Sequence, residues 1–200
     1  ADQVGKAQRL EDARGRYITH LKVNFPNESS LEGLKIVVDC SHGATYKIAP
    51  TVLTELGAMV TLLAVKPNGK NINHNCGAVH PEKMTQKVRE VGADVGVAFD
   101  GDGDRAIFSD ENGRLFDGDD VMGILAKPLR SQGELGKGVV GTVMSNFGLE
   151  QYLKAQRIPF FRAPVGDRYV VEVMKEKGAL FGGEPSGHIV SLHRSTTGDG

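Results

Sequence analysis

The apolar positions in the first half of the chain follow two patterns. Spacings of three and four residues over 10–24 predict an amphipathic helix, which Pro26 ends. Short apolar runs predict buried strands, and the segments between them carry helix-start and helix-stop residues. After the first helix, the predicted elements are a strand at 34–40, a helix at 49–57, a strand at 58–65, a helix at 81–91 and a strand at 93–99. This alternation is typical of a mainly parallel sheet covered by helices.

The second half repeats this plan. Residues 105–116 predict two strands around a turn at Asn112-Gly113. A helix follows from Gly118, its start capped and charged by Asp117, Asp119 and Asp120. The later predicted elements are a strand at 137–144, a helix at 148–156, a strand at 158–163, a helix at 167–178 and two strands around a Gly-rich loop at 179–192.

We therefore expect an α/β protein made of two similar α/β units. Each unit is predicted to be a mainly parallel mixed sheet flanked by helices. The boundary between the units is predicted near Phe116–Gly118, which gives residues 1–116 and 117–200.

Composition narrows the class of protein. The 200 residues are 40% hydrophobic and 24% charged, which is ordinary for a soluble globular chain with a real core. The net charge of −1 and the scattered Lys and Arg give no case for a nucleic-acid or membrane partner. Two cysteines, Cys40 and Cys76, suggest reduced thiols, so we expect a cytoplasmic protein. The oligomeric state stays open, a homodimer included.

The segment "VAFDGDGDR", Val97 to Arg105, places three aspartates after a predicted strand. Their position predicts that Asp100, Asp102 and Asp104 lie at the carboxyl edge of a parallel sheet, where α/β proteins bind ligands. The glycines between them let the backbone curl so that the carboxylates converge. Carboxylates this close need a cation, and Mg²⁺ prefers oxygen ligands. An arginine beside such a metal pairs with an aspartate or holds a phosphate, which indicates phosphoryl chemistry.

Two other interpretations of this segment stay open. The aspartates match positions 1, 3 and 5 of an EF-hand, but Arg105 stands where that loop needs Gly, and the flanks are strand-like. The second alternative is a solvated acidic turn after a strand.

A second polar loop, "GGEPSGH", separates the last two predicted strands. Glu184, Ser186 and His188 alternate along it, so on an extended loop their side chains point the same way. A carboxylate, a hydroxyl and an imidazole on one side suit the binding of sugar hydroxyls. A plain polar β-turn is the alternative.

The two loops together, with "TTGDG" after them, resemble the α-D-phosphohexomutases. The resemblance covers essentially the whole chain. It implies a four-domain magnesium enzyme that moves a phosphate between the C6 and C1 oxygens of a hexose. A phosphoserine donates the phosphate, and a 1,6-bisphosphate is the intermediate. A phosphosugar is the implied substrate.

The resemblance also implies roles for single residues. Asp100, Asp102 and Asp104 would hold Mg²⁺ together with one phosphoserine oxygen. Arg105 would help to neutralise the phosphate during transfer.

In the second loop, Glu184 and Ser186 would bind sugar hydroxyls, and His188 would transfer a proton or contact phosphate. Asp167 and Arg168, which open a predicted helix, are weaker candidates for substrate contact.

One departure from the family concerns the phosphoserine. The family's Ser-His-Asn-Pro-like loop has no counterpart, because Ser41-His42 is not followed by Asn-Pro and fits the Asp-x-x-x-Gly-Ala turn of the second domain. The resemblance therefore implies the second domain, with the helix before it, and most of the third.

We expect the first and fourth domains of the same protein to be partners of a fragment that binds metal weakly and does not turn over. The residues do not choose among hexoses, and a non-catalytic metal- or sugar-binding module is the alternative from another class.

Overall fold

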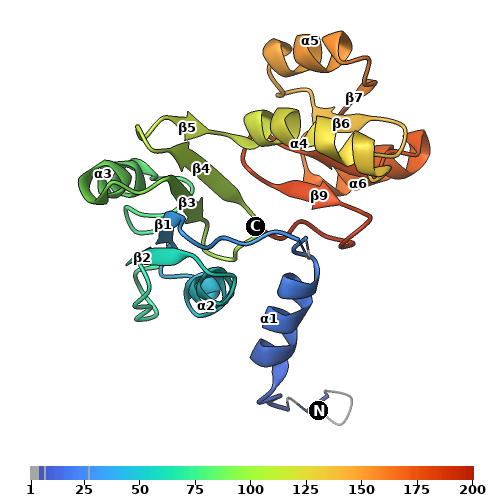
Figure 1. Ribbon diagram of the computed structural model, residues 1–200. Coiled ribbons are helices and arrows are strands. Elements are labelled where there is room, and N and C mark those ends of the chain that lie inside the picture. Colours follow the sequence, from blue (N-terminus) through green and yellow to red (C-terminus); the bar gives the residue numbers. More distant parts are fainter. Residues whose placement is uncertain (1–4, 7, 27) are drawn as a thin grey trace.

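The computed structural model describes residues 5, 6, 8–26 and 28–200, and two separate sheets organise them (Figure 1). One sheet has five strands in the order β2-β1-β3-β4-β5, and the other has four in the order β7-β6-β8-β9. Both combine parallel and antiparallel strands, and helices flank both. The predicted α/β fold of two similar units is confirmed.

The first sheet forms where the short apolar runs were predicted. Its elements are β1 (Lys35–Asp39), η1 (Ala44–Tyr46), α2 (Ile48–Glu55), β2 (Met59–Leu63), α3 (Glu82–Val91), β3 (Val95–Phe99), β4 (Ala106–Asp110) and β5 (Leu115–Phe116). The strand β1 lies between β2 and β3 and is parallel to both. The strands β4 and β5 continue the sheet antiparallel.

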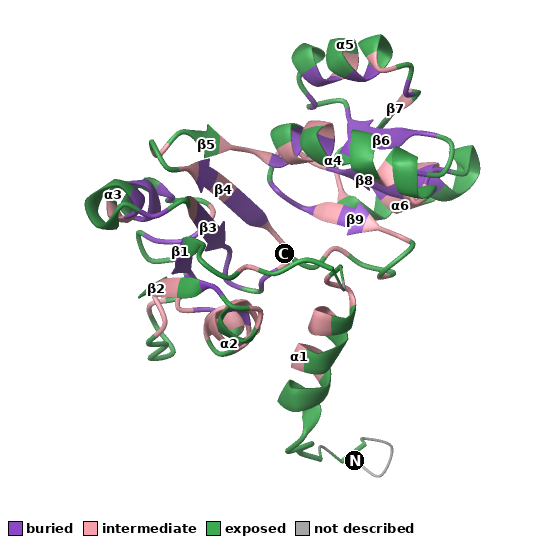
Figure 2. Ribbon diagram, viewed as in Figure 1, coloured by how far each residue is buried: buried purple, intermediate pink, exposed green. Residues whose placement is uncertain are grey.

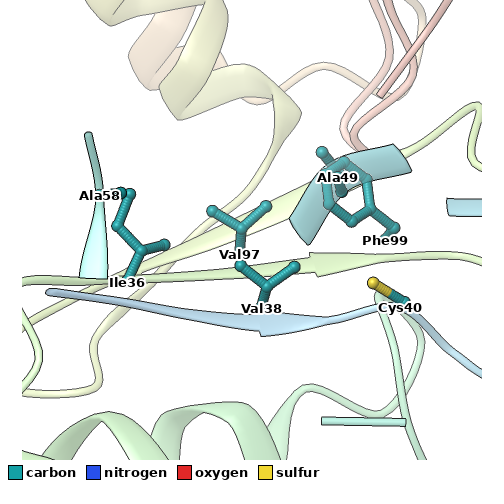
Figure 3. Packing of buried hydrophobic residues seen from close by; sticks show 8 residues of the cluster. Ile36, Val38, Cys40, Ala49, Ala58, Val97 and Phe99 are labelled. Carbon is teal, nitrogen blue, oxygen red and sulfur yellow. The ribbon is translucent and has the colours of Figure 1, made fainter. Parts of the chain in front are cut away.

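Alternate residues of β1 and β3 face opposite helices, which explains why Ile36–Val38 of β1 and the whole of β3 are apolar. Val38 and Phe99 pack with α2 residues in one buried cluster (Figure 3). Val37 packs with Met84 and Val88 of α3 in the other. Because β1 and β3 are parallel neighbours, their carboxyl ends reach the same edge of the sheet.

The second sheet repeats the arrangement with a shorter antiparallel end. Its elements are α4 (Gly118–Gln132), β6 (Val139–Thr142), α5 (Phe147–Ala155), β7 (Phe160–Ala163), α6 (Asp167–Lys177), β8 (Phe181–Gly183) and β9 (Ile189–Ser191). The strand β6 is parallel to β7 and β8, whereas β9 is antiparallel to β8. Figure 2 shows buried residues concentrated in the inner strands of the sheets, such as β1, β3 and β6, whereas β2 and β5 at the edges of the first sheet contain none.

The helix α1 (Ala13–Val23) differs most from its prediction. It is shorter than the predicted 10–24, and none of its residues is buried. Tyr17 and Leu21 are half-buried on the side of α2, while Leu10 lies before the helix and is exposed. Figure 1 shows α1 projecting away from both sheets. Among the described residues, no helix has both the length and the apolar character that crossing a bilayer requires.

Candidate functional site

Three aspartates follow β3 and converge at the carboxyl edge of the first sheet. One carboxylate oxygen from each of Asp100, Asp102 and Asp104 lies within 4.8 Å of the other two. The backbone curls because Gly103 adopts a φ of +78° and donates its N–H to Oδ1 of Asp100 at 3.1 Å. The expected convergence of the carboxylates is therefore present. We call residues 100–105 the aspartate loop.

Asp100 is the buried member of this group, and Arg105 compensates its charge. The Asp100 side chain is 1% exposed. Its Oδ2 accepts a hydrogen bond from Nε of Arg105 at 2.7 Å, and its Oδ1 accepts one from the Arg105 backbone N–H at 3.2 Å. Burial lowers the pKa of Arg105, but the carboxylates of Asp100 and Asp104 raise it by more, so its net shift is upward. Arg105 thus remains a fixed positive charge beside the carboxylates.

Asp104 joins the aspartate loop to the second unit. Its Oδ2 lies 3.1 Å from Nδ1 of His188, a residue that is 5% exposed. Its Oδ1 is buried, makes no hydrogen bond among the described residues, and lies 3.5 Å from Nε of Arg105. The backbones of the two polar segments are in contact as well. The N–H of Ala106, directly after the aspartate loop, donates to the carbonyl of Gly187 in the second polar loop at 3.1 Å.

The donor set fits a hard cation. The site offers carboxylate oxygens only, Asp102 is exposed, and Oδ1 of Asp104 has no hydrogen-bond donor among the described residues. Oxygen ligands of this kind bind Mg²⁺, Mn²⁺ or Ca²⁺, so the group can hold a metal ion. A cation would compete with Arg105 for Asp100.

The EF-hand alternative for this segment is wrong, because strands β3 and β4 flank the loop and pair antiparallel, where an EF-hand requires helices. The alternative of an acidic turn stays open: Asp100 is buried, whereas Asp102 is exposed.

The second polar loop is a β-turn, so the expectation of an extended loop is wrong. The N–H of Gly187 donates to the carbonyl of Glu184 at 3.1 Å, and the N–H of Glu184 donates to the carbonyl of His188 at 2.9 Å. Strands β8 and β9 form a short hairpin, and the turn closes it because Gly187 supplies a φ of +92°. Ser186 is exposed at its tip. We call residues 184–188 the hairpin turn.

The remaining candidates lie around the start of α6. Oε1 of Glu184 accepts the N–H of Gly166 at 2.9 Å, which places this carboxylate just before the helix. Asp167 and Arg168 are exposed in its first turn. Together with His188 they border a cavity of about 300 Å³. The structure thus brings His188 to the aspartates, and Asp167 and Arg168 to His188.

Asp119 has a role that the sequence did not reveal. Asp117 and Asp120 form the capping box of α4, as predicted. Asp119 is an acidic residue of the first turn, as expected, but its side chain does not cap the helix: it turns inward, is 2% exposed, and its Oδ2 accepts the N–H of Asn146 at 2.6 Å. Burial is the main cause that raises its pKa. Asp119 connects the start of α4 to the loop before α5. The sequence does not indicate this contact, because Asp119 stands between two acids that cap the helix.

Each of the two units matches a domain model of one protein family. Residues 15–113 match the model described as phosphoglucomutase/phosphomannomutase, alpha/beta/alpha domain II, and residues 117–200 match that of alpha/beta/alpha domain III.

Two curated relatives align over the full length of this chain. The phosphoglucosamine mutase of Pseudoalteromonas translucida is 56% identical over 200 residues, and that of Desulfotalea psychrophila is 57% identical over 201 residues. The alignments cover 100% of this chain but 44% and 45% of those proteins. The chain therefore spans less than half the length of these relatives.

Solved structures share the fold. A phosphoglucomutase/phosphomannomutase family protein from Burkholderia thailandensis superposes with a TM-score of 0.81 at 25% identity, over 93% of this chain and 40% of that one. An Aspergillus fumigatus N-acetylphosphoglucosamine mutase, solved with GlcNAc-6P and magnesium, superposes with a TM-score of 0.64 at 20% identity. That match covers 87% of this chain and 38% of the other. At this identity the second likeness concerns the fold alone.

Proposed function

The chain belongs to the phosphoglucomutase/phosphomannomutase family, and we propose that it forms the second and third domains of a phosphoglucosamine mutase. The proposed reaction interconverts glucosamine 6-phosphate and glucosamine 1-phosphate through a phosphoserine enzyme and a 1,6-bisphosphate intermediate. Its product would supply UDP-N-acetylglucosamine synthesis in the cytoplasm. We keep the domain boundary between residues 116 and 117.

The observation that carries this proposal is the junction of the aspartate loop with the hairpin turn. A phosphoryl transfer to a sugar needs a cation site and a sugar site close together. Asp104 and His188 meet at 3.1 Å, although they belong to different sheets. This contact supports one shared site for both loops.

We assign the metal site to the three aspartates, and we assign magnesium as the ion that it holds. Asp100, Asp102 and Asp104 would hold Mg²⁺, and their oxygen donors suit it. When bound, the ion supplies positive charge that stabilises the phosphoryl oxygens during transfer. The Arg105 side chain is 40% exposed, and its guanidinium can turn from Asp100 toward a phosphate oxygen. This mobility would let one arginine stabilise the buried carboxylate and the transferring group in turn.

The hairpin turn and the start of α6 would bind the sugar. Glu184 and Ser186 present a carboxylate and a hydroxyl that suit sugar hydroxyls. Nδ1 of His188 faces Asp104, and its Nε2 is buried with no hydrogen-bond partner among the described residues. Nε2 is the ring nitrogen free to exchange a proton with a substrate hydroxyl, which would require the backbone at Gly198, packed against this atom, to move aside. Asp167 and Arg168 border the same cavity and would contact the substrate from α6.

The phosphoserine and the fourth domain have no counterpart in these 200 residues. We therefore expect this chain alone to bind Mg²⁺ weakly and to show no turnover. We assign glucosamine as the sugar because relatives such as the Pseudoalteromonas translucida protein are named phosphoglucosamine mutase. Glucose and mannose phosphates are the alternative substrates, because hydroxyl contacts suit several hexoses.

A chimera tests the proposal. This chain would replace the matching segment of the Pseudoalteromonas translucida phosphoglucosamine mutase. We expect Mg²⁺-dependent conversion of glucosamine 6-phosphate, faster than that of glucose or mannose 6-phosphate. A preference for mannose would overturn the sugar assignment. A folded chimera without mutase activity on any of the three would overturn the enzymatic one.

A further inference from the structure

A buried carboxylate at the end of β1 connects two loops. Asp39 is 1% exposed, and its Oδ1 accepts the backbone N–H of Ser41 at 2.9 Å. Its Oδ2 accepts the backbone N–H of Gly77 at 3.0 Å. One side chain thus holds the loop after β1, residues 40–45, against the loop that precedes α3, residues 64–78.

Both loops form hydrogen bonds with the backbone on either side of Asp100, at the end of β3 and the start of the aspartate loop. The carbonyl of Phe99 accepts the hydroxyl of Ser41 and also the N–H of Ala78, the latter at 2.9 Å. The carbonyl of Gly101 accepts the N–H of Ala44 at 2.8 Å. The carbonyls on either side of Asp100 are therefore fixed by the loops that Asp39 connects.

The two loops pack so closely against the backbone around Asp100 that glycine is required at two positions. A Cβ at Gly43 would overlap the carbonyl of Gly101, and one at Gly77 would overlap the Ser41 hydroxyl and the Phe99 carbonyl. Backbone contacts this close mean that a shift of either loop moves the aspartate loop as well.

Backbone strain is concentrated in the same two loops. Six non-glycine residues among those described have positive φ, and five of them lie between 41 and 75: Ser41, His42, Ala64, Asn73 and Asn75. Such conformations cost free energy and persist only where surrounding contacts hold them. Here Asp39 accepts the N–H of Ser41, and the Ser41 carbonyl accepts the N–H of Asn73 at 2.9 Å, so two of these residues are held beside the aspartate loop.

Asp39 lacks the usual compensation for burial. Among the described residues, no Lys or Arg side chain forms an ion pair with it, and backbone N–H groups are its donors. A buried carboxylate held only in this way is expensive for stability alone. The contacts of Asp39, which fix two loops around one site, give a functional reason for keeping a carboxylate whose burial costs free energy.

We propose that Asp39 and Ser41 are positioning residues that hold the aspartate loop in the shape a metal ion requires. The metal part of this inference rests on the proposed function. The positioning part rests on the contacts alone. In this inference both residues act through the carbonyls of Phe99 and Gly101 rather than as ligands of the ion.

Hydrogen exchange tests the positioning. The amides of Gly103 and Arg105 both donate to Asp100, so they report the shape of the aspartate loop. In Asp39→Asn and Ser41→Ala we expect these two amides to exchange at least about tenfold faster relative to the Val37 amide of β1. The matched control is Asp94→Asn, which loses a carboxylate that accepts the N–H of Lys35 at the opposite edge of the sheet.

A purely structural role would speed exchange at Gly103, Arg105 and Val37 alike, and that result would overturn the proposal. So would loop amides that respond to Asp94→Asn as strongly as to Asp39→Asn.

Titration with Mn²⁺, followed by electron paramagnetic resonance, tests the link to metal. We expect Asp39→Asn to weaken Mn²⁺ binding about tenfold, as losses around metal ligands do. Unchanged affinity despite a loosened loop would overturn the link to metal. If the unsubstituted chain binds no Mn²⁺ but its loop amides respond as expected, the positioning holds and the proposed metal function fails.

Discussion

Nδ1 of His188 lies 3.1 Å from Oδ2 of Asp104, so a side chain of the hairpin turn contacts a side chain of the aspartate loop. Directly beside it, the N–H of Ala106 donates to the carbonyl of Gly187 at 3.1 Å. The two sheets are thus joined through the residues proposed to act on phosphate and sugar. Changes at this junction should therefore affect both stability and ligand binding.

Removing the imidazole should weaken the junction. In His188→Leu, Oδ2 of Asp104 loses its hydrogen bond with Nδ1 of His188, so we expect the free energy of unfolding to fall by about 1–3 kcal/mol. Urea unfolding followed by circular dichroism measures this. His193→Leu is the control, because His193 is exposed and its contact with a carboxylate is longer, 3.5 Å from Nε2 to Oε1 of Glu134. Equal effects of the two substitutions would contradict the importance of the Asp104 contact.

Removing the guanidinium should destabilise the chain in a way that metal corrects. Arg105→Met leaves the buried Asp100 without its cation. We expect a loss of about 2 kcal/mol, less than for a fully buried pair because Arg105 is 40% exposed. Saturating Mg²⁺ should raise the melting temperature of this variant by more than that of the unsubstituted chain.

The control for Arg105→Met is Arg168→Met, which removes an exposed ion pair with Glu172 and should leave stability and the metal response unchanged. A melting temperature of Arg105→Met that Mg²⁺ does not raise would argue against a cation site at Asp100.

The backbone contact between the loops depends on a glycine. Gly187 has a φ of +92°, and a Cβ there would overlap the carbonyl of Ala106. Gly187→Ala should therefore cost about 2 kcal/mol or more. Gly133→Ala is a matched control, since Gly133 has a φ of +76° but open space around its Cβ position. Thermal unfolding of both variants separates the overlap from the strain in φ, and equal losses would refute the close approach of the loops.

Alkaline pH should reveal the buried thiol of Cys40. Burial is the main cause that raises its pKa from 9.0 to about 11, and the nearby carboxylate of Asp39 raises it further. The unfolded chain releases this proton near pH 9, whereas the folded chain keeps it. Stability should therefore fall as pH rises from about 9 to about 11, by an amount on the order of 2 kcal/mol.

Urea unfolding of the chain and of Cys40→Ala across this pH range measures the effect. The variant should lose less stability than the unsubstituted chain. Cys76 and Tyr17, whose pKa values are also raised, titrate in both proteins and cancel in the difference. Parallel pH profiles would contradict the raised pKa of Cys40.

Much of this structure follows from local sequence pattern. Apolar runs such as β3 identify strands because both faces of a parallel strand are buried. The alternation of Asp and Gly after β3 predicts that the carboxylates converge, because glycine allows the tight curl. These features depend only on neighbours in the sequence.

Other features depend on contacts between distant segments, and the sequence did not reveal them. Asp104 and His188 are 84 positions apart, and their contact exists only once the two sheets are placed. Asp39 and Asp119 look like ordinary acids at the end of a strand and the start of a helix. Their roles come from backbone N–H groups that distant loops bring to them. For the hairpin turn, alternating polar residues suit an extended loop as well as a β-turn, so the sequence does not choose between these two alternatives.

The most direct test of the central claim is turnover of glucosamine 6-phosphate by the chimera with and without Asp102→Asn. Asp102 is exposed, so its substitution should leave the fold intact while removing one charge from the proposed metal site. We expect kcat/KM to fall by about 100-fold or more, since the metal contributes several kcal/mol of transition-state stabilisation. The Asp94→Asn chimera should retain full activity. Near-normal turnover by the Asp102→Asn chimera would contradict the assignment of the aspartate loop as the metal site of a mutase.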